Sequence, residues 1–293
     1  MGTFVDDVSG KVRSGWVLGL FVVIAAGAYG VGSAAVSFLG LYPKDPLTLD
    51  DGYLFFTTMV MLAAALGATV VCALLLKAEV GLPRARWARH LLFGIALGGG
   101  LVALAVVIPV VAGQGSLSFT TGSFGAVAAS AAMQLAILGP TSIGEELLMR
   151  GVPLRALVRG TRPWIAVALT GGVFGVMHLM NPGASMVAAL NVALVGLWFG
   201  ALTLRTSLWT AIGAHLAWNW FEGFVFGQPV SGIKPGRSLF EAPVELSGFF
   251  SGGDFGPEAS GLTTVLLLLA TAATVLWPKT LDTPRHFAEE PPQ

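Results

Sequence analysis

The sequence predicts an all-α protein that crosses a membrane several times. Of its 293 residues, 55% are hydrophobic and only 11% are charged, and the mean hydropathy is +0.78. A soluble domain carries about 25% charged residues. Apolar runs long enough to span a bilayer, which takes about 20 residues, recur along the chain. Short stretches rich in Gly, Pro and charge separate these runs, as expected for loops between spanning helices.

Eight apolar runs are expected to form spanning helices. They are residues 16–41, 53–76, 91–112, 124–150, 163–180, 185–204, 207–226 and 260–277. The first is longer than a signal-peptide core and no convincing small-residue cleavage site follows it, so it is expected to be retained. The predicted organisation is a cytoplasmic segment 1–15, three helices in 16–112, a four-helix core in 124–226, an extracytoplasmic loop 227–259, a last helix in 260–277 and a polar tail 278–293.

The distribution of Lys and Arg predicts the orientation, because these residues collect on the cytoplasmic side of membrane proteins. With the N-terminus inside, thirteen lie on the cytoplasmic side: Lys11, Arg13, Lys77, Arg84, Arg86, Arg89, Arg150, Arg155, Arg159, Arg162, Arg205, Lys279 and Arg285. Only three lie outside: Lys44, Lys234 and Arg237. Both termini are therefore expected in the cytoplasm. A chain rich in Gly and Ala, with more Arg than Lys, is typical of a bacterial protein and hence of the plasma membrane.

The charge balance and the cysteine count exclude several classes of function. The formal net charge is zero and no basic face is apparent, so nucleic-acid binding is not expected. The expected partners are the lipid bilayer and a membrane-associated protein or peptide, whereas the sequence assigns no oligomeric state. The single cysteine, Cys72, excludes an intramolecular disulfide and a cysteine-ligated metal cluster. The absence of a recognisable repeat disfavours a secondary transporter.

Adjacent carboxylates interrupt the fourth apolar run. Glu145, Glu146 and Arg150 lie in sequence that otherwise reads as a spanning helix. A charged side chain near the bilayer centre costs about 2.5 to 3.5 kcal/mol on insertion scales, so these residues need partners or a polar cavity. Glu146 and Arg150 stand four residues apart on one helix face and can pair. Glu145 points about 100° away and is available for another role.

Two further spans carry polar pairs at helical spacing. Phe174 and His178 lie four residues apart in the fifth span, and His215 and Asn219 lie four apart in the seventh. At 1.5 Å per residue, Glu145 and His178 each come to about 20 Å from the turn that joins their helices. His215 comes to about 13 Å from the turn before its own helix. If the cavity opens towards the cytoplasm, residues at these different distances from the turns can line one site.

A carboxylate, two imidazoles and an amide in a cavity of low dielectric are the components of a hydrolytic centre. Glu145 can take a proton from water as a general base, and one histidine can orient that water. The other histidine and Asn219 can donate hydrogen bonds to an oxyanion. Glu145, His178 and His215 are also a zinc ligand set with one open position. The residues alone leave both readings open.

The three motifs resemble those of a known family in order and spacing. Glu145-Glu146-x-x-x-Arg150, Phe174-x-x-x-His178 and His215-x-x-x-Asn219 are similar to the motifs of the CPBP intramembrane proteases. This family includes the CAAX prenyl endopeptidases and bacteriocin-processing enzymes and is also called the abortive-infection (ABI) family. The resemblance covers about residues 125–225.

The resemblance implies an eight-helix membrane fold with a cytoplasm-facing cavity, and hydrolysis of a peptide bond in a membrane-associated protein or peptide. Under it, Glu145 activates water, His178 positions that water, and His215 with Asn219 forms the oxyanion site. A metal-independent glutamate mechanism without a cofactor is favoured over a metalloprotease that uses zinc or another divalent metal. The prenylated protein substrates of the eukaryotic family members are not expected for this chain, because its composition is typical of a bacterial protein.

The remaining motif residues, Glu146, Arg150 and Phe174, are expected to support the site. Two alternatives to a protease stay open. The first is a noncatalytic membrane protein of the same fold that binds a partner, as in immunity or scaffolding. The second is a proton-coupled transporter that uses the Glu and His residues as a relay.

Overall fold

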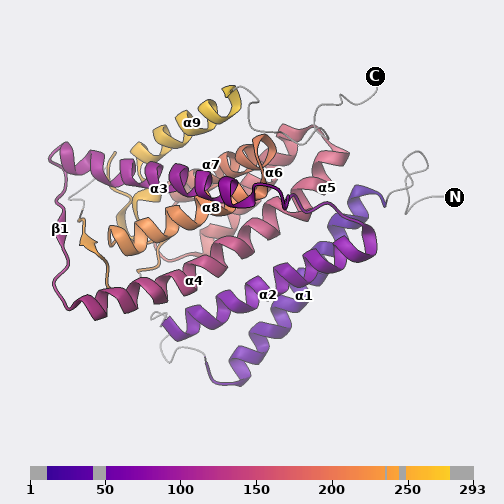
Figure 1. Cartoon of the computed structure of the whole chain (residues 1–293), viewed down its shortest axis with the longest axis horizontal. Helices are drawn as coiled ribbons and strands as arrows, with labels where there is room; N and C mark the ends of the chain where they lie inside the picture. The colour runs from indigo at the N-terminus through magenta and orange to yellow at the C-terminus, as the bar shows by residue number, and fades with distance from the viewer. Residues whose placement is uncertain (1–11, 42–50, 235, 244–248, 278–293) are drawn as a thin grey trace.

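The computed structural model describes residues 12–41, 51–234, 236–243 and 249–277, and most of them lie in helices (Figure 1). The α-helices are α1 (Ser14–Phe38), α2 (Asp51–Leu76), α3 (Trp87–Val111), α4 (Phe124–Arg150), α5 (Val152–Gly160), α6 (Pro163–Met177), α7 (Met186–Arg205), α8 (Leu208–Trp220) and α9 (Gly261–Leu276). Shorter elements are η1 (His178–Met180), the π-helical η2 (Phe221–Val225), η3 (Gly253–Phe255), η4 (Pro257–Ala259) and the antiparallel strands β1 (Ser118–Phe119) and β2 (Phe240–Glu241). The predicted all-α fold is confirmed.

Six helical segments of the described chain are long and apolar enough to cross a membrane. They are Ser14–Phe38, Asp51–Leu76, Trp87–Val111, Phe124–Gly160, Pro163–Met180 and Met186–Arg205. The predicted seventh span forms the shorter helix α8, which η2 continues, and the predicted eighth forms the short apolar helix α9. The protein is therefore a multi-pass membrane protein.

The helices begin where the sequence supplies capping residues. Ser123, Ser185 and Ser260 each precede a helix, and each side chain accepts a hydrogen bond from the backbone N–H three residues later. Such a cap satisfies one of the N–H groups that the first helical turn leaves without a partner. Pro163 begins α6, where its missing N–H costs nothing. These positions agree with the breaks between the predicted spans.

Helices α3 and α8 approach each other closely through glycine. A Cβ atom added at Gly98 would lie 2.0 Å from the carbonyl oxygen of Ala214, and one at Gly213 would lie 2.2 Å from that of Leu91. Only glycine permits backbones to pack at this distance, as is common between membrane helices. The contact seats α8, which carries two of the predicted site residues, against α3.

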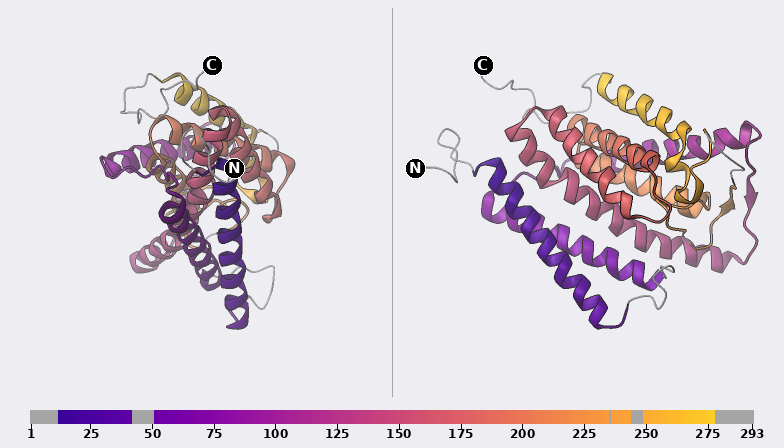
Figure 2. Two further views of the ribbon diagram at one scale, coloured as in Figure 1. Left: turned by 90° about the vertical axis from the view of Figure 1, so that its right-hand side faces the viewer. Right: turned by 180° about the vertical axis from the view of Figure 1, so that it is seen from behind.

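The helices run back and forth between two ends of the molecule. Figures 1 and 2 show α1 and α2 on one side of the bundle and α9 on the opposite side. At one end, hydrogen bonds join the start of α1, the α2–α3 loop, α5, the α7–α8 turn and the end of α9. These bonds run from Arg159 to the carbonyl of Val12, from the N–H of Leu208 to Gly81, from the indole of Trp209 to Pro83, and from Arg205 to Val275.

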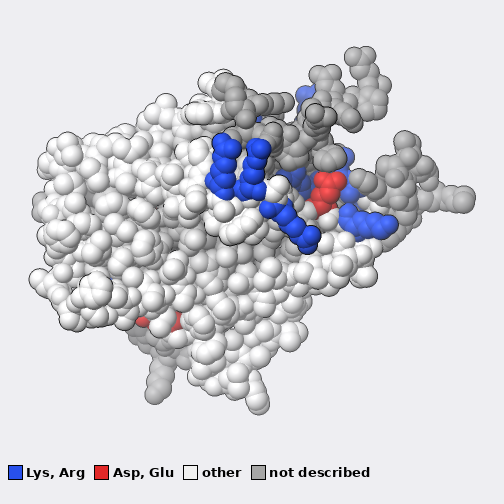
Figure 3. Space-filling model, viewed as in Figure 1, with Lys and Arg blue, Asp and Glu red and all other residues white. Residues whose placement is uncertain are grey.

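We call this end the basic end, because it carries most of the described Lys and Arg residues: Arg13, Lys77, Arg84, Arg86, Arg89, Arg155, Arg159, Arg162 and Arg205. Figure 3 shows Lys and Arg side chains gathered over the half of the visible face where α1 begins and α5 lies. The opposite end, here called the loop end, is built from the described parts of residues 112–123, 178–185 and 226–260. Strands β1 and β2 pair there.

Candidate active site

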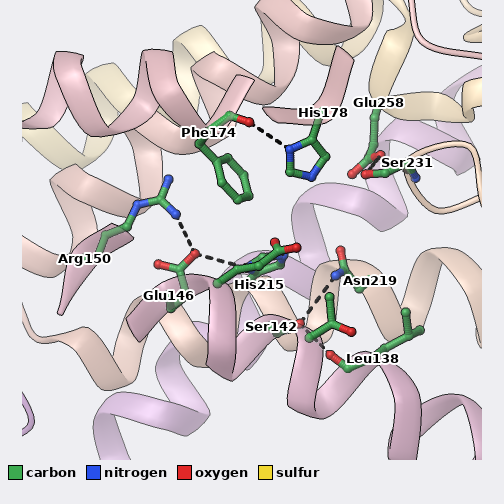
Figure 4. A network of polar contacts seen from close by, with 12 residues as sticks. Leu138, Ser142, Glu146, Arg150, Phe174, His178, His215, Asn219, Ser231 and Glu258 are labelled. Atoms are coloured by element: carbon green, nitrogen blue, oxygen red, sulfur yellow. Dashed lines mark hydrogen bonds and ion pairs between the residues drawn. The ribbon is translucent and has the colours of Figure 1, made fainter. Parts of the chain in front are cut away.

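Helices α4, α6 and α8 bring the predicted site residues together (Figure 4). Glu145 and Glu146 lie on α4, and His215 and Asn219 lie on α8. His178 is the residue at which α6 ends and η1 begins. Three segments that are separate in the sequence therefore converge at one place.

The Glu146 side chain is enclosed in the protein, where it pairs with Arg150 and is hydrogen-bonded to His215. Arg150 donates from Nη1 to Glu146 Oε1 at 2.8 Å, and both side chains have 0% exposure. The same oxygen lies 3.0 Å from Nδ1 of His215. A carboxylate paired with arginine can only accept hydrogen bonds, so Nδ1 of His215 is the donor. The structure thus contains the Glu146–Arg150 pair that the four-residue spacing predicts, and it adds His215 to that pair.

Aromatic rings cover the Arg150 guanidinium. Its central carbon lies 4.5 Å from the ring centroid of Phe174 and 5.7 Å from that of Phe199. Rings at this distance attract a desolvated cation. Nε and Nη2 have no hydrogen-bond partner among the described residues, so the rings provide much of the remaining contact. A Cβ at Gly196 would lie 3.0 Å from Nη2, so glycine leaves the guanidinium its space.

Glu145 differs from its neighbour because it faces a cavity. Its side chain is 21% exposed and lines a cavity of about 240 Å³ together with His178, His215 and Asn219. Liquid water occupies roughly 30 Å³ per molecule, so the cavity has space for several. Glu145 Oε2 lies 3.6 Å from Nε2 of His215. The imidazole of His215 therefore stands between the two carboxylates.

His178 is held in one tautomer by a backbone partner. Its Nδ1 lies 2.8 Å from the carbonyl oxygen of Phe174. A carbonyl only accepts, so Nδ1 carries the proton and Nε2 of the neutral ring carries the lone pair. The ring of Phe174 contacts the imidazole edge-on, with 4.6 Å between centroids. The bond to the carbonyl four residues earlier thus fixes the His178 ring, which lines the cavity and has Nε2 as its acceptor nitrogen.

Asn219 is oriented by Ser142, a residue that the sequence analysis did not single out. The Ser142 hydroxyl donates to the carbonyl of Leu138 at 2.8 Å, so its lone pairs remain to accept from Asn219 Nδ2 at 3.4 Å. Both side chains are buried. The amide thus presents its nitrogen towards α4. Ser142 lies three residues before Glu145 on the same helix, and this spacing was the signal that could have identified it.

A further acidic residue, Glu258, lies beside the site, and the sequence analysis did not single it out either. Glu258, in η4, is buried, and its Oε2 accepts from both the N–H and the hydroxyl of Ser231 at 2.7 Å. Glu258 and Ser231 line a small pocket that also contains His178 and His215. Burial raises the pKa of the Glu258 carboxyl, and the Ser231 bonds and the two nearby histidines partly offset this. Nothing in the loop sequence marks these residues, because their partners are distant in the chain.

The cavity lies towards the loop end of the bundle. Asp51, Asn181 and Ser231, all near or in the loops of that end, contribute to its lining. The basic end carries the first and last described residues, Val12 and Trp277. The predicted cytoplasm-facing cavity and the predicted cytoplasmic termini therefore cannot both hold. Counting residues from the turns gave the distance of each residue from a turn. It did not give the end of the bundle at which the cavity opens.

The predicted zinc ligand set is not gathered around one point. Within the part of the chain that the structure describes, no group of three or more His, Cys, Asp or Glu side chains is placed to hold a metal ion. Nδ1 of His178 and Nδ1 of His215 are each engaged by another partner, a carbonyl and the Glu146 carboxylate. In this arrangement Glu145, His178 and His215 do not fit the metal site that their residue types allow.

Together the fold and the site define a multi-pass membrane protein with a cluster of carboxylate, imidazole and amide side chains inside the helical bundle. Residues 127–221 match the family described as type II CAAX prenyl endopeptidase Rce1-like. This match contains all three motifs and confirms the resemblance to the CPBP family.

One curated relative is the uncharacterized protein YyaK of Bacillus subtilis (strain 168). It is 35% identical over 82 residues, which is 26% of this chain and 27% of that protein. The chain thus matches about a quarter of the length of this relative. No solved structure matches the chain.

Proposed function

We propose that this protein is an intramembrane endopeptidase that hydrolyses a peptide bond in a membrane-associated protein or peptide. The observation that carries the proposal is the difference between two neighbouring carboxylates. Glu145 faces a cavity with space for water, which His178, His215 and Asn219 also line. Glu146 is fully buried and does not face this cavity. The Rce1-like family match supports a protease of the CAAX type.

Glu145 is the general base of the proposed reaction. It takes one proton from a water molecule in the cavity, and Nε2 of His178 accepts a hydrogen bond from the other proton of that water. The resulting hydroxide forms a bond to the carbonyl carbon of the substrate. Glu145 then delivers its proton to the amine as the C–N bond breaks, so the products are one carboxylate and one amine. Such general acid–base catalysis contributes about 10² to 10⁴ in rate.

His215 and Asn219 stabilise the oxyanion in this scheme. Nδ1 of His215 is bonded to Glu146, so Nε2, which lies beside Glu145 at the cavity, is the nitrogen that donates in this scheme. The Asn219 amide is fixed by Ser142 through one N–H and has another N–H to donate. Preorganised donors of this kind require no rearrangement as charge develops.

The proposed chemistry uses only side chains of this chain, which makes it a glutamate-type rather than a metal-dependent protease. The proposed location is the plasma membrane of a bacterium. The proposal predicts that a chelator added to the purified protein leaves the cleavage rate unchanged. Loss of cleavage on chelation, restored by zinc, would overturn the glutamate-type mechanism while leaving the protease function in place.

The experiment that tests the function compares the new peptide termini in membranes of cells that carry wild type, Glu145→Gln or the control Glu241→Gln. Glu241 is an exposed glutamate in β2, far from the motifs in the sequence. The three proteins are expressed at equal levels and their folding is checked. Termini that appear with wild type and with the control, but not with Glu145→Gln, are expected. Identical termini in all three would overturn the protease proposal and favour a noncatalytic binding role.

A further inference from the structure

The cavity has a closed floor and an open mouth. Towards the basic end, Glu146, Leu147 and Arg150 are fully buried behind Glu145. Towards the loop end, the lining includes Asp51, an exposed residue at the start of α2, and Tyr29, whose side chain is 45% exposed. Water and substrate therefore reach Glu145 from the loop end.

A tight turn forms one wall of this mouth. Val230 and Ile233 exchange two backbone hydrogen bonds of 2.9 Å, with Ser231 and Gly232 between them at φ values of 47° and 83°. Val230, Ser231 and Ile233 all line the cavity. The segment that the sequence suggested as a solvated loop thus shapes the site.

The turn is fixed in place by bonds to three other segments. Gly232 donates its N–H to the carbonyl of Phe255 at 2.8 Å, and Ser231 donates twice to Glu258. Asn181, in the loop after η1, donates to the Ser231 carbonyl at 3.0 Å. A Cβ at Gly232 would lie 1.9 Å from the carbonyl oxygen of Pro182, so glycine is required there. A wall anchored in this way belongs to the loop end and not to the basic end.

The two ends differ in charge in the way that sets membrane orientation. The described cations of the loop end are Lys234 and Arg237, whereas the basic end carries nine. Basic loops stay in the cytoplasm, so the basic end faces inside and the loop end faces outside. Of the two conflicting expectations, the cytoplasmic termini agree with the charge distribution and the cytoplasm-facing cavity does not.

We propose that the active-site cavity opens on the extracytoplasmic side, and that the substrate is a membrane-associated protein whose scissile segment is presented from that side. The identity of the substrate class rests on the proposed protease function, whereas the orientation of the cavity does not. Proteins whose cleavable segment is exposed only in the cytoplasm are excluded as substrates.

Cysteine accessibility tests the orientation without any need for activity. The single native cysteine is buried and is first replaced by Cys72→Ala. Lys234→Cys then marks the loop end, and Arg162→Cys marks the basic end. A membrane-impermeant maleimide is added to intact cells. Labelling of Lys234→Cys alone is expected, with Arg162→Cys labelled only after the membrane is opened. The reverse pattern, or equal labelling of both, would overturn the proposal.

A third position tests the cavity itself. Thr58 lines the cavity from α2 and is half-buried, so Thr58→Cys should react with a small charged thiosulfonate added outside intact cells. The native Cys72, which lies on the same helix and is fully buried, is the matched control and should not react. Reaction of Thr58→Cys only in inverted vesicles would overturn the proposal.

The substrate part of the proposal has its own readout. The peptide termini that depend on Glu145 should map to extracytoplasmic or outer membrane-proximal segments of their parent proteins. Termini that map to cytoplasmic segments would overturn it. If wild type yields no termini at all, the protease function fails, but the labelling results still decide the orientation. The two failures are therefore distinguishable.

Discussion

The buried cluster around Glu146 and the cavity around Glu145 begin one residue apart on α4, yet they are physically opposite. Glu146 has no exposed surface and is bonded to Arg150 and His215, while the guanidinium is covered by the rings of Phe174 and Phe199. Glu145 is partly exposed and faces space for water. The 100° rotation between successive helical residues is enough to separate the two environments.

This difference shows that a glutamate can serve two purposes, structural or chemical, depending on its surroundings. A buried ion pair holds helices and side chains in one arrangement, and it is costly to break because an unpaired charge remains. A carboxylate beside water can move a proton. Changes in the buried cluster should therefore affect folding, and changes in the cavity should affect the reaction rate while the fold remains.

The largest effect is expected for Arg150→Met. This change leaves Glu146 buried without its cation, and the loss of one partner of a buried pair costs about 3 to 5 kcal/mol. The measurement is thermal unfolding of the purified protein, with Arg89→Met, a change at an exposed arginine of α3, as the matched control. A melting temperature equal to that of wild type would show that the buried cluster does not hold the fold together.

A large loss of rate with an intact fold is expected for His178→Ala. The change removes the Nε2 acceptor that we propose orients the water, so kcat should fall by about 10² to 10⁴. The melting temperature should change little, because the side chain is only half-buried. His178→Gln, which can still donate to the Phe174 carbonyl, should fall nearly as far. Full activity of the Gln variant would mean that His178 acts through its backbone contact alone.

A smaller loss of rate is expected at the proposed oxyanion site. Asn219→Ala removes a donor and should lower kcat by about 10² to 10³. Ser142→Ala keeps the amide but removes the bond that orients it, so the fall should be about two- to tenfold, as expected for a bond worth 0.5 to 1.5 kcal/mol. The measurement is kcat on one substrate for both variants. A Ser142→Ala effect as large as that of Asn219→Ala would contradict this order.

The smallest effect is expected for Ser231→Ala at the mouth of the cavity. Glu258 keeps the backbone N–H of residue 231 as a donor, so only one of its two bonds is lost. The KM should rise by a few-fold, in line with one hydrogen bond of about 1 kcal/mol, and kcat should be unchanged. Steady-state kinetics separates the two quantities. A fall in kcat with constant KM would place Ser231 in the chemistry instead of at the mouth.

The local parts of the site were predictable from the sequence. Pairs four residues apart share a helix face, so the contacts of Arg150 with Glu146 and of His178 with the Phe174 carbonyl follow from spacing. The eight apolar runs also correspond to eight of the nine described α-helices, although the last two are shorter than expected and α5 was not predicted as a separate helix. Hydrophobic length is a local property of the chain, and it predicts helices well.

The parts that the sequence could not provide depend on contacts between distant residues. His215 bonds to Glu146, which lies 69 residues earlier, and Ser231 bonds to Glu258 in a loop with no helical period. The end of the bundle at which the cavity opens depends on which helix ends meet, and residue counts along single helices do not contain that information. The three-dimensional packing of α4, α6 and α8 supplies it.

The most direct measurement of the central claim is the cleavage rate of purified Glu145→Gln in lipid vesicles, on a substrate named by the new termini, together with its melting temperature. The change keeps the size of the side chain but removes the base. The account predicts a rate lower by about 10² to 10⁴ at an unchanged melting temperature. Cleavage at the wild-type rate by this variant would show that Glu145 is not the residue that activates water.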